Sequence, residues 1–160
     1  MATKAEAALE RFQKQAGQED APGAWHRVTQ DQIDLFAEAT GDHQFIHTDP
    51  EQAAKLSPYQ VTVAHGFLTL SLLPFLQTSI PAADPAAYEG VYMGVNYGLD
   101  RVRFPAPVKV DSRVRARREL IAVEPKGPGT LQLKQKVTVE IEGEAKPGCV
   151  AEFLTRLMYS

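Results

Sequence analysis

The sequence contains only one cysteine, Cys149, among its 160 residues. A single cysteine excludes an intramolecular disulfide and a zinc site built from cysteines, and it is typical of proteins in a reducing compartment. Long hydrophobic runs are also missing. The longest, residues 67–76, is interrupted by polar residues and a proline and is far shorter than the roughly 20 residues of a membrane-spanning helix. The charged N-terminal segment lacks the apolar core of a signal peptide. We therefore expect a soluble cytoplasmic protein with no membrane span.

An excess of positive charge is absent as well. Lys and Arg number 17 against 20 Asp and Glu, which gives a net charge of −3, so a nucleic-acid partner is not expected. The sequence contains no phosphate-binding loop, no G-x-G-x-x-G and no G-x-S-x-G. The usual signatures of phosphoryl transfer and serine hydrolysis are therefore missing. With 44% hydrophobic and 23% charged residues, the composition is that of an ordinary globular domain.

The first part of the chain has helical periodicity. Residues 3–15 predict a short amphipathic helix, followed by a linker and a short strand at residues 25–28. Thr29, with a glutamine three residues later, predicts the start of a second helix, and Gly41 its end. Residues 42–59 read as a loop with one or two helical turns near its middle.

The next apolar segment, residues 65–76, is hydrophobic on nearly every side and predicts a central helix buried on most of its circumference. Pro74 should kink or end that helix. Beyond residue 90 the period changes to two, which predicts strands. Helices followed by antiparallel strands indicate an α+β fold, with a sheet packed over a buried helix. The expected strands lie near residues 91–104, 111–123, 131–141 and 149–158.

Asp42 and His47 follow the predicted helix end and carry the most informative chemistry. A carboxylate and an imidazole aimed at one water can take its proton and return one, as the addition of water to an activated double bond requires. Taken alone, the two residues also fit a turn cap and a packed core histidine. Together with His43 they offer ligand types that zinc accepts, but their spacing matches no zinc pattern, so no metal is predicted.

Three segments resemble the MaoC-like, (R)-specific enoyl-CoA hydratase family. Residues 40–50 read TGDHQFIHTDP and look like the hydratase signature, in which Gly-Asp is followed by a His five residues after the Asp. The dipeptide Gln-Phe at residues 44–45 stands where the family commonly has Asn-Pro, and this departure resembles the nodulation-protein-N-like branch. Residues 64–71, AHGFLTLS, look like the start of the family's central helix, and residues 93–108 resemble its next strand and turn.

This resemblance covers residues 25–159 and implies a hot-dog fold, in which a curved antiparallel sheet wraps around a buried central helix. Residues 24–160 are then a MaoC-like hot-dog domain, and residues 1–23 form an N-terminal helical extension and linker. The resemblance also implies a homodimer whose two sheets join, and such pairing would protect an exposed sheet edge.

The activity implied by the resemblance is reversible hydration of trans-2-enoyl-CoA to (R)-3-hydroxyacyl-CoA, with no cofactor. Carried over to this sequence, Asp42 and His47 are the catalytic pair. The chemistry agrees, because hydration needs a base, an acid and a donor to the thioester oxygen, on which negative charge builds. The sequence does not decide which of the two residues is the base.

Four further residues are expected to bind the substrate. His65 and Gly66 open the central helix, where free backbone N–H groups can stabilise an oxyanion and glycine permits close approach; a tight entry into a packed helix is the alternative. Ser71 matches a small polar residue of the family, or bonds back to its own helix. Asn96 is expected to shape the pocket or the subunit contact.

Arg113, Arg115 and Arg117 alternate along one predicted strand face. Such a face would attract the phosphates of coenzyme A, or would simply be a solvated strand face.

Two other functions remain open at this point. A hot-dog acyl-CoA thioesterase would polarise the thioester at the same helix end, although the Asp-x-x-x-x-His spacing argues against it. A non-catalytic acyl-thioester binding protein is the second, and a retained buried charge pair argues against that.

Overall fold

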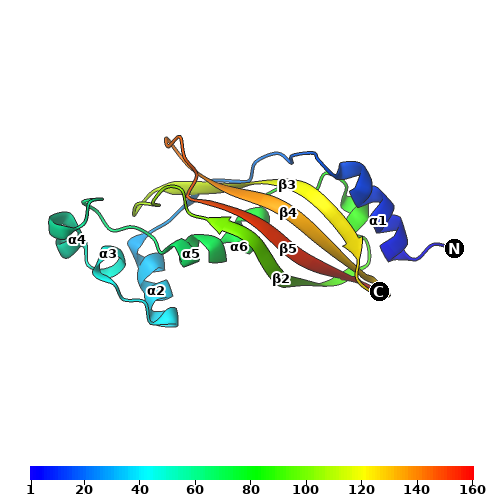
Figure 1. Cartoon of the computed structure of the whole chain (residues 1–160), viewed down its shortest axis with the longest axis horizontal. Helices are drawn as coiled ribbons and strands as arrows, with labels where there is room; N and C mark the ends of the chain where they lie inside the picture. The colour runs from blue at the N-terminus through cyan, green and yellow to red at the C-terminus, as the bar shows by residue number, and fades with distance from the viewer.

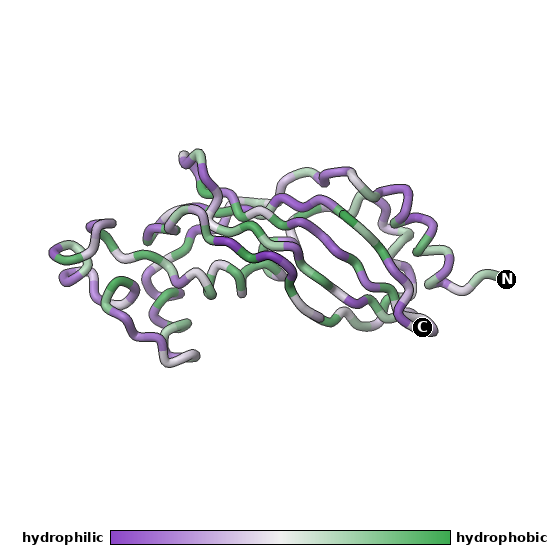
Figure 2. The backbone as a smooth tube through the Cα atoms, in the orientation of Figure 1, coloured by the Kyte–Doolittle hydropathy of each residue, from purple (hydrophilic) through white to green (hydrophobic).

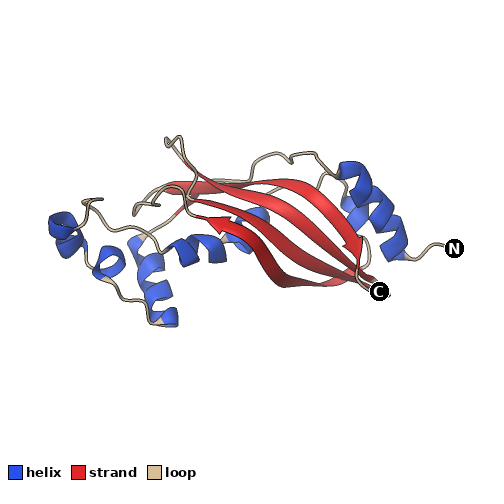
Figure 3. Ribbon diagram, in the orientation of Figure 1, coloured by secondary structure: helices blue, strands red, loops and turns tan.

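A single antiparallel sheet forms the centre of the computed structural model, which describes all 160 residues. Its five strands lie in the order β1-β3-β4-β5-β2, so β1 and β2 are the edges. Figures 1 and 3 show the long strands β3, β4, β5 and β2 side by side in this order. The four predicted long strands and the short strand before the second helix are confirmed. Their bounds are His26–Arg27 (β1), Val91–Arg103 (β2), Arg113–Pro125 (β3), Thr130–Ile141 (β4) and Cys149–Tyr159 (β5).

Six α-helices and one 3-10 helix surround the sheet. In Figure 1, α2, α3 and α4 gather beyond one end of the strands, α5 and α6 run along the sheet, and α1 lies at the opposite end. None of these helices combines the length and the apolar character needed to cross a lipid bilayer. Their bounds are Lys4–Gln15 (α1), Gln30–Thr40 (α2), Phe45–Thr48 (α3), Pro50–Leu56 (α4), Gly66–Ser71 (α5), Leu73–Gln77 (α6) and Pro85–Tyr88 (η1).

Helix α2 starts after Thr29 and ends before Gly41, as predicted. The Thr29 side chain accepts a hydrogen bond from the Gln32 amide at 3.2 Å, which satisfies one of the free N–H groups of the first turn. At the other end Gly41 adopts φ 82°, a left-handed conformation that glycine reaches without steric cost. This turn delivers Asp42 directly beyond the helix.

One face of the sheet carries the core. Side chains alternate between buried and partly exposed along β4, and hydrophobic and hydrophilic residues alternate along the strands in Figure 2. At one end of this face Leu68, Leu73 and Leu76 of α5 and α6 pack against Val137 and Val139 of β4. The predicted α+β architecture, a curved antiparallel sheet over a buried helical segment, is thus confirmed.

The central helix is interrupted, as expected from Pro74. The structure divides it into α5 and α6, with the break at Leu72. Pro74 explains the break, because its ring nitrogen has no hydrogen to donate to the preceding turn. The segment is buried on most sides, as expected, but one side is open, since Phe67 is 69% and Phe75 55% exposed.

The segment at residues 42–59 is more helical than predicted. α4 confirms the helical turns expected in its middle, but α3 precedes it, so His47 lies on a short helix rather than in a loop. The Asp49 side chain accepts from the Gln52 amide at 3.0 Å and caps α4, and Pro50 occupies its first turn.

The other end of the buried sheet face is covered by α1. Phe12, which is 1% exposed, packs edge-on against Tyr88 of η1 with 5.2 Å between ring centroids. Leu120 of β3, Leu131 of β4 and Leu157 of β5 belong to the same hydrophobic cluster. The sheet face is therefore covered along its length by two separate helical segments.

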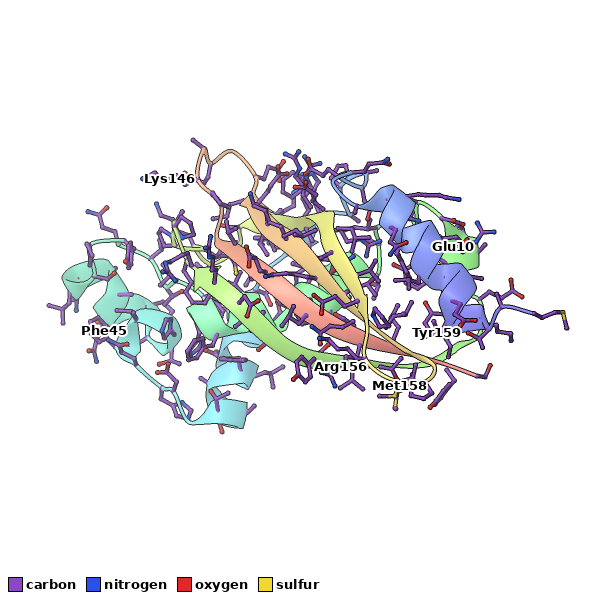
Figure 4. The ribbon with its side chains drawn as sticks, turned by 45° about the vertical axis from the view of Figure 1, so that its right-hand side comes forward. Glu10, Phe45, Lys146, Arg156, Met158 and Tyr159 are labelled. Atoms are coloured by element: carbon purple, nitrogen blue, oxygen red, sulfur yellow. The ribbon has the colours of Figure 1, made fainter.

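We expect Phe12→Ala to lower the free energy of unfolding by about 3–5 kcal/mol, because it removes a fully buried aromatic ring. Urea denaturation measures the change. Glu10→Ala, at an exposed position of the same helix labelled in Figure 4, is the matched control and should change stability by less than about 0.5 kcal/mol. Equal effects of the two substitutions would show that α1 is not docked on the sheet.

Candidate active site

Asp42 lies in the four-residue connection between α2 and α3. Its side chain is exposed, and its Oδ1 accepts a hydrogen bond from the Gln44 amide at 3.3 Å. The carboxylate is therefore held near the start of α3 without being buried. The buried charge pair suggested by the sequence is not formed, because one of its two members is open to solvent.

His47 is buried, with 7% of its surface exposed. Its Nδ1 lies 2.6 Å from the Val63 carbonyl oxygen, which can only accept, so Nδ1 carries the proton and Nε2 keeps a free lone pair in the neutral ring. The backbone around it is anchored from two sides. Gln30 Nε2 donates to the His47 carbonyl at 2.7 Å, and the Val63 amide donates to the Ile46 carbonyl at 2.9 Å.

His65 joins this pair from the start of α5. It is 2% exposed, its Nε2 lies 2.9 Å from the Asp42 carbonyl oxygen, and its ring stacks on that of His47 with 3.8 Å between centroids and 24° between planes. Polar side-chain atoms of Asp42, His47 and His65 all lie within 4.8 Å of one another. The sequence pointed to the first two as a catalytic pair and to His65 as a substrate-binding residue at the entry of the central helix.

The surroundings of His47 lower its pKa below the ordinary histidine value. Burial is the main cause, because it disfavours the charged ring, and the nearby His65 acts in the same direction. The hydrogen bond to Val63 and the charge of Asp42 oppose this shift. A histidine that stays neutral at neutral pH is suited to accept a proton through Nε2.

Two of the four ring nitrogens are engaged with backbone carbonyls, namely His47 Nδ1 and His65 Nε2. His47 Nε2, His65 Nδ1 and the Asp42 carboxylate are left, and these are groups that can exchange protons with a water or bind a metal ion.

A cavity of about 270 Å³ adjoins His47. Gly66 lines it, and a Cβ at this position would lie 3.1 Å from the Phe104 ring, so glycine permits the close packing between α5 and the segment after β2. Seven of its thirteen lining residues are hydrophobic, so part of its wall suits a hydrocarbon chain. The lining residues are Ile46, His47, Tyr59, Val63, Ala64, Gly66, Thr69, Phe104, Pro105, Ala106, Pro107, Val108 and Gly148.

Of the four predicted substrate-binding residues, His65, Ser71 and Asn96 lie outside the lining of this cavity. The Ser71 hydroxyl donates to the Phe67 carbonyl of its own helix at 2.7 Å, which is the back-bonded alternative considered from the sequence. Asn96 is exposed on the edge strand β2, opposite Thr155 of β5. Within one chain, neither of these last two side chains is brought to the Asp42–His47 pair.

The arginine-rich strand face is neutralised by carboxylates. Arg113 pairs with Glu142, and Arg115 and Arg117 both pair with Glu140, at 2.7 Å and 2.9 Å. These arginines form a charged strand face and offer no free cluster for the phosphates of coenzyme A.

Two curated proteins match most of the chain. The 3-hydroxyacyl-thioester dehydratase Z of Mycobacterium tuberculosis (strain ATCC 25618 / H37Rv) is 52% identical over 141 residues, which cover 88% of this chain and 89% of that protein. Nodulation protein N of Rhizobium leguminosarum bv. viciae is 50% identical over 143 residues, which cover 89% and 86% respectively.

The fold also matches solved structures. The (R)-hydratase from A. caviae involved in PHA biosynthesis superposes with a TM-score of 0.66 at 22% identity, covering 88% of this chain and 94% of that chain. This likeness confirms the hot-dog fold. The family profile described as MaoC like domain matches residues 11–144. With this profile over most of its length and two relatives at half identity or more, the chain belongs to the MaoC-like dehydratase family.

Proposed function

We propose that this MaoC-like dehydratase catalyses the reversible hydration of a trans-2-enoyl-CoA to an (R)-3-hydroxyacyl-CoA, without a metal or organic cofactor. The observation that carries the proposal is the meeting of Asp42 with a neutral, buried His47 beside a cavity that is apolar in part. The name of the 52% identical relative supports the reaction class, because dehydration of a 3-hydroxyacyl thioester is the reverse of enoyl hydration. The free, buried Cys149 suits the reducing cytoplasm, where we place the protein.

In this proposal one water is held between the Asp42 carboxylate and His47 Nε2. The water loses a proton to the pair as its oxygen bonds to the β-carbon of the enoyl group. The electrons of the double bond then move to the α-carbon, which takes a proton from the pair on the same face. The carbon–carbon double bond becomes a single bond, the thioester stays intact and the pair regains its starting protonation.

Negative charge that builds on the thioester oxygen needs a hydrogen-bond donor. The backbone ladder of α5 begins with the Leu68 amide, which donates to the His65 carbonyl at 3.0 Å. The amides of Gly66 and Phe67 precede this ladder, and Gly66 lines the cavity. We assign these two amides to the thioester oxygen. The acyl chain then lies along the apolar walls formed by Ala64 and the segment after β2.

The experiment that tests this function follows the enoyl absorbance of crotonyl-CoA and of a longer trans-2-enoyl-CoA after protein is added. Free thiol is assayed in the same cuvette. Loss of enoyl absorbance without thiol release, with the (R)-alcohol identified by chiral chromatography, is the expected result. Thiol release would instead identify a thioesterase, and no change with either substrate would leave an acyl-thioester binding protein.

We also propose that the protein is a homodimer joined along β2. This 13-residue strand is an edge of the sheet, and its unpaired backbone groups suit pairing with a second copy. Exposed apolar side chains lie on β2 and on the uncovered side of α5 and α6, where a second copy would bury them. They are Phe67, Phe75, Tyr92, Met93, Val95, Tyr97 and Leu99.

Sedimentation velocity should show a particle of two chains. We expect Met93→Lys, on the β2 edge, to shift this species toward monomer, because a charged side chain blunts an edge strand. Ile121→Lys is the matched control, since Ile121 is exposed to a similar degree (39% against 43%) but lies on β3, which β4 and β5 separate from β2. A monomeric wild-type protein would contradict the proposed dimer.

A further inference from the structure

We propose that His65 is a positioning residue for the Asp42–His47 pair: it fixes the Asp42 backbone through a hydrogen bond and holds the His47 ring by stacking. This inference rests on the proposed function, because His65 acts on the same site. It assigns to His65 a role in setting the geometry and the protonation of the pair, beyond its place at the start of the central helix.

The first contact is the hydrogen bond to Asp42. The Asp42 carbonyl can only accept, so His65 Nε2 carries the proton and donates across 2.9 Å. The Asp42 side chain is itself exposed, so its place depends on how its backbone is held. His65 ties this backbone to the start of α5, a segment packed into the core, from 23 residues further along the chain.

The second contact is the stack with His47. One face of the His65 ring lies against the His47 ring, and Phe36 of α2 also packs on His65, with 4.9 Å between centroids. His65, at the start of α5, therefore contacts side chains of both α2 and α3. Moving this ring would move the ring of the catalytic histidine with it.

The unpartnered nitrogen of His65 argues against a role in packing alone. Its Nδ1 is buried and has no hydrogen-bond partner within the chain, an arrangement that costs folding free energy. A phenylalanine would fill a similar space without this cost. An imidazole, however, donates from Nε2 to Asp42 and presents an aromatic face to His47 in one side chain.

Charge links the two histidines. Two titratable groups act on His47, namely Asp42 after α2 and His65 at the start of α5, and on the solvent side His43 lies 3.6 Å from Glu38. The His65 ring, stacked on His47 with 3.8 Å between centroids, is one of the causes that lower the pKa of His47. Removing the His65 imidazole should therefore let His47 protonate at a higher pH.

The kinetic test compares His65→Phe with His65→Gln. Phenylalanine keeps an aromatic ring but loses the donor to Asp42, and we expect kcat to fall by about 10²-fold with little change in KM, as for a misplaced catalytic group. Glutamine places an amide N–H near the Nε2 position, so it should recover most of this loss. His26→Phe is the matched control, because His26 also packs edge-on against a phenylalanine and bonds a neighbour at 2.9 Å, but away from this site.

A second readout follows the titration of His47 by NMR, and it requires no turnover. We expect the pKa of His47 to rise in both His65 variants and to stay unchanged in His26→Phe. In the wild-type protein, nitrogen shifts should show His65 protonated at Nε2 and bare at Nδ1, a result that does not depend on any variant. If the wild type lacks hydratase activity, the proposed function fails while these spectra still test the positioning role.

Three results would overturn the proposal. They are an unchanged kcat in His65→Phe, a His65 ring protonated at Nδ1 and bare at Nε2, and equal kinetic losses in both variants with an unmoved His47 titration. The last would indicate that His65 only supports the fold.

Discussion

Replacing Asp42 with asparagine should lower kcat for enoyl-CoA hydration by about 10²–10⁴-fold, the range that a general acid or base contributes. The amide has nearly the size of the carboxylate but cannot exchange a proton with the bound water. Because Asp42 is exposed and accepts only a long hydrogen bond of 3.3 Å from the Gln44 amide, the variant should keep its fold. Steady-state kinetics with crotonyl-CoA and thermal unfolding measure the two effects separately.

Asp31→Asn is the control for this substitution, because Asp31 is an exposed carboxylate in the first turn of the same helix α2. It should leave kcat unchanged. Calorimetric titration with an acyl-CoA should show that Asp42→Asn still binds the substrate, as expected when chemistry rather than binding is lost. Wild-type turnover by Asp42→Asn would remove this carboxylate from the mechanism.

His47→Gln should cause a loss of the same size, because an amide nitrogen in place of Nε2 cannot accept a proton. It also loses the ring hydrogen bond to the Val63 carbonyl. If Asp42 and His47 act as a unit on one water, the double variant should be little slower than either single variant. Single-turnover measurements with each variant test this non-additivity, and fully additive losses would indicate two independent roles.

Because the pKa of His47 is lowered in the folded protein, both stability and activity should fall at acid pH. The unfolded chain binds a proton to His47 near the ordinary pKa of 6.5, whereas the folded protein binds it only at lower pH. Its contribution to stability is therefore present above about pH 6.5 and is lost as pH falls through the folded pKa. The acid limb of kcat/KM should lie below about pH 6.5 in the wild type, and the corresponding loss of stability should disappear in His47→Gln.

His43→Gln provides the matched control on the same connection. His43 is 51% exposed and lies 3.6 Å from Glu38, outside the stacked pair. Its replacement should leave both the rate and the acid limb unchanged. An equal loss of activity in this variant would mean that the catalytic histidine has been misassigned.

The elements that surround the site could be predicted from interactions between residues close together in the sequence. The start of α2 at Thr29 and its end at Gly41 depend on hydrogen bonds and backbone angles within a few residues, and both followed from the sequence. The same holds for β4, where every second side chain is buried. Asp42 was placed beyond a helix end for this reason.

The remaining parts of the site depend on contacts between distant residues. α3 has no side-chain cap at its start, and it is anchored by Gln30 and Val63, each about 17 residues from the backbone group that it binds. The meeting of His65 with Asp42 joins positions 23 residues apart. Sequence periodicity does not predict a contact between such distant residues. The only local signal at this position was the His65-Gly66 pair before an apolar segment.

The central helical segment, α5 and α6, shows what hydrophobic patterning alone does not predict. Its apolar residues predicted burial on most of its circumference but did not show which side is open, and Phe67 and Phe75 are exposed in the single chain. An apolar sequence pattern indicates that a helix face is buried. It does not indicate whether residues of the same chain or of a second chain bury it.

The packing of α1 has a consequence for synthesis of the chain. Phe12 shares a hydrophobic cluster with Leu157, yet about 145 residues separate them. At about 5–20 residues per second, roughly 7–30 s pass between the translation of the two. During this interval the apolar side of α1, formed by Ala5, Ala8 and Phe12, has no β5 to cover it. The apolar side of α1 is therefore fully covered only after the last strand has been made.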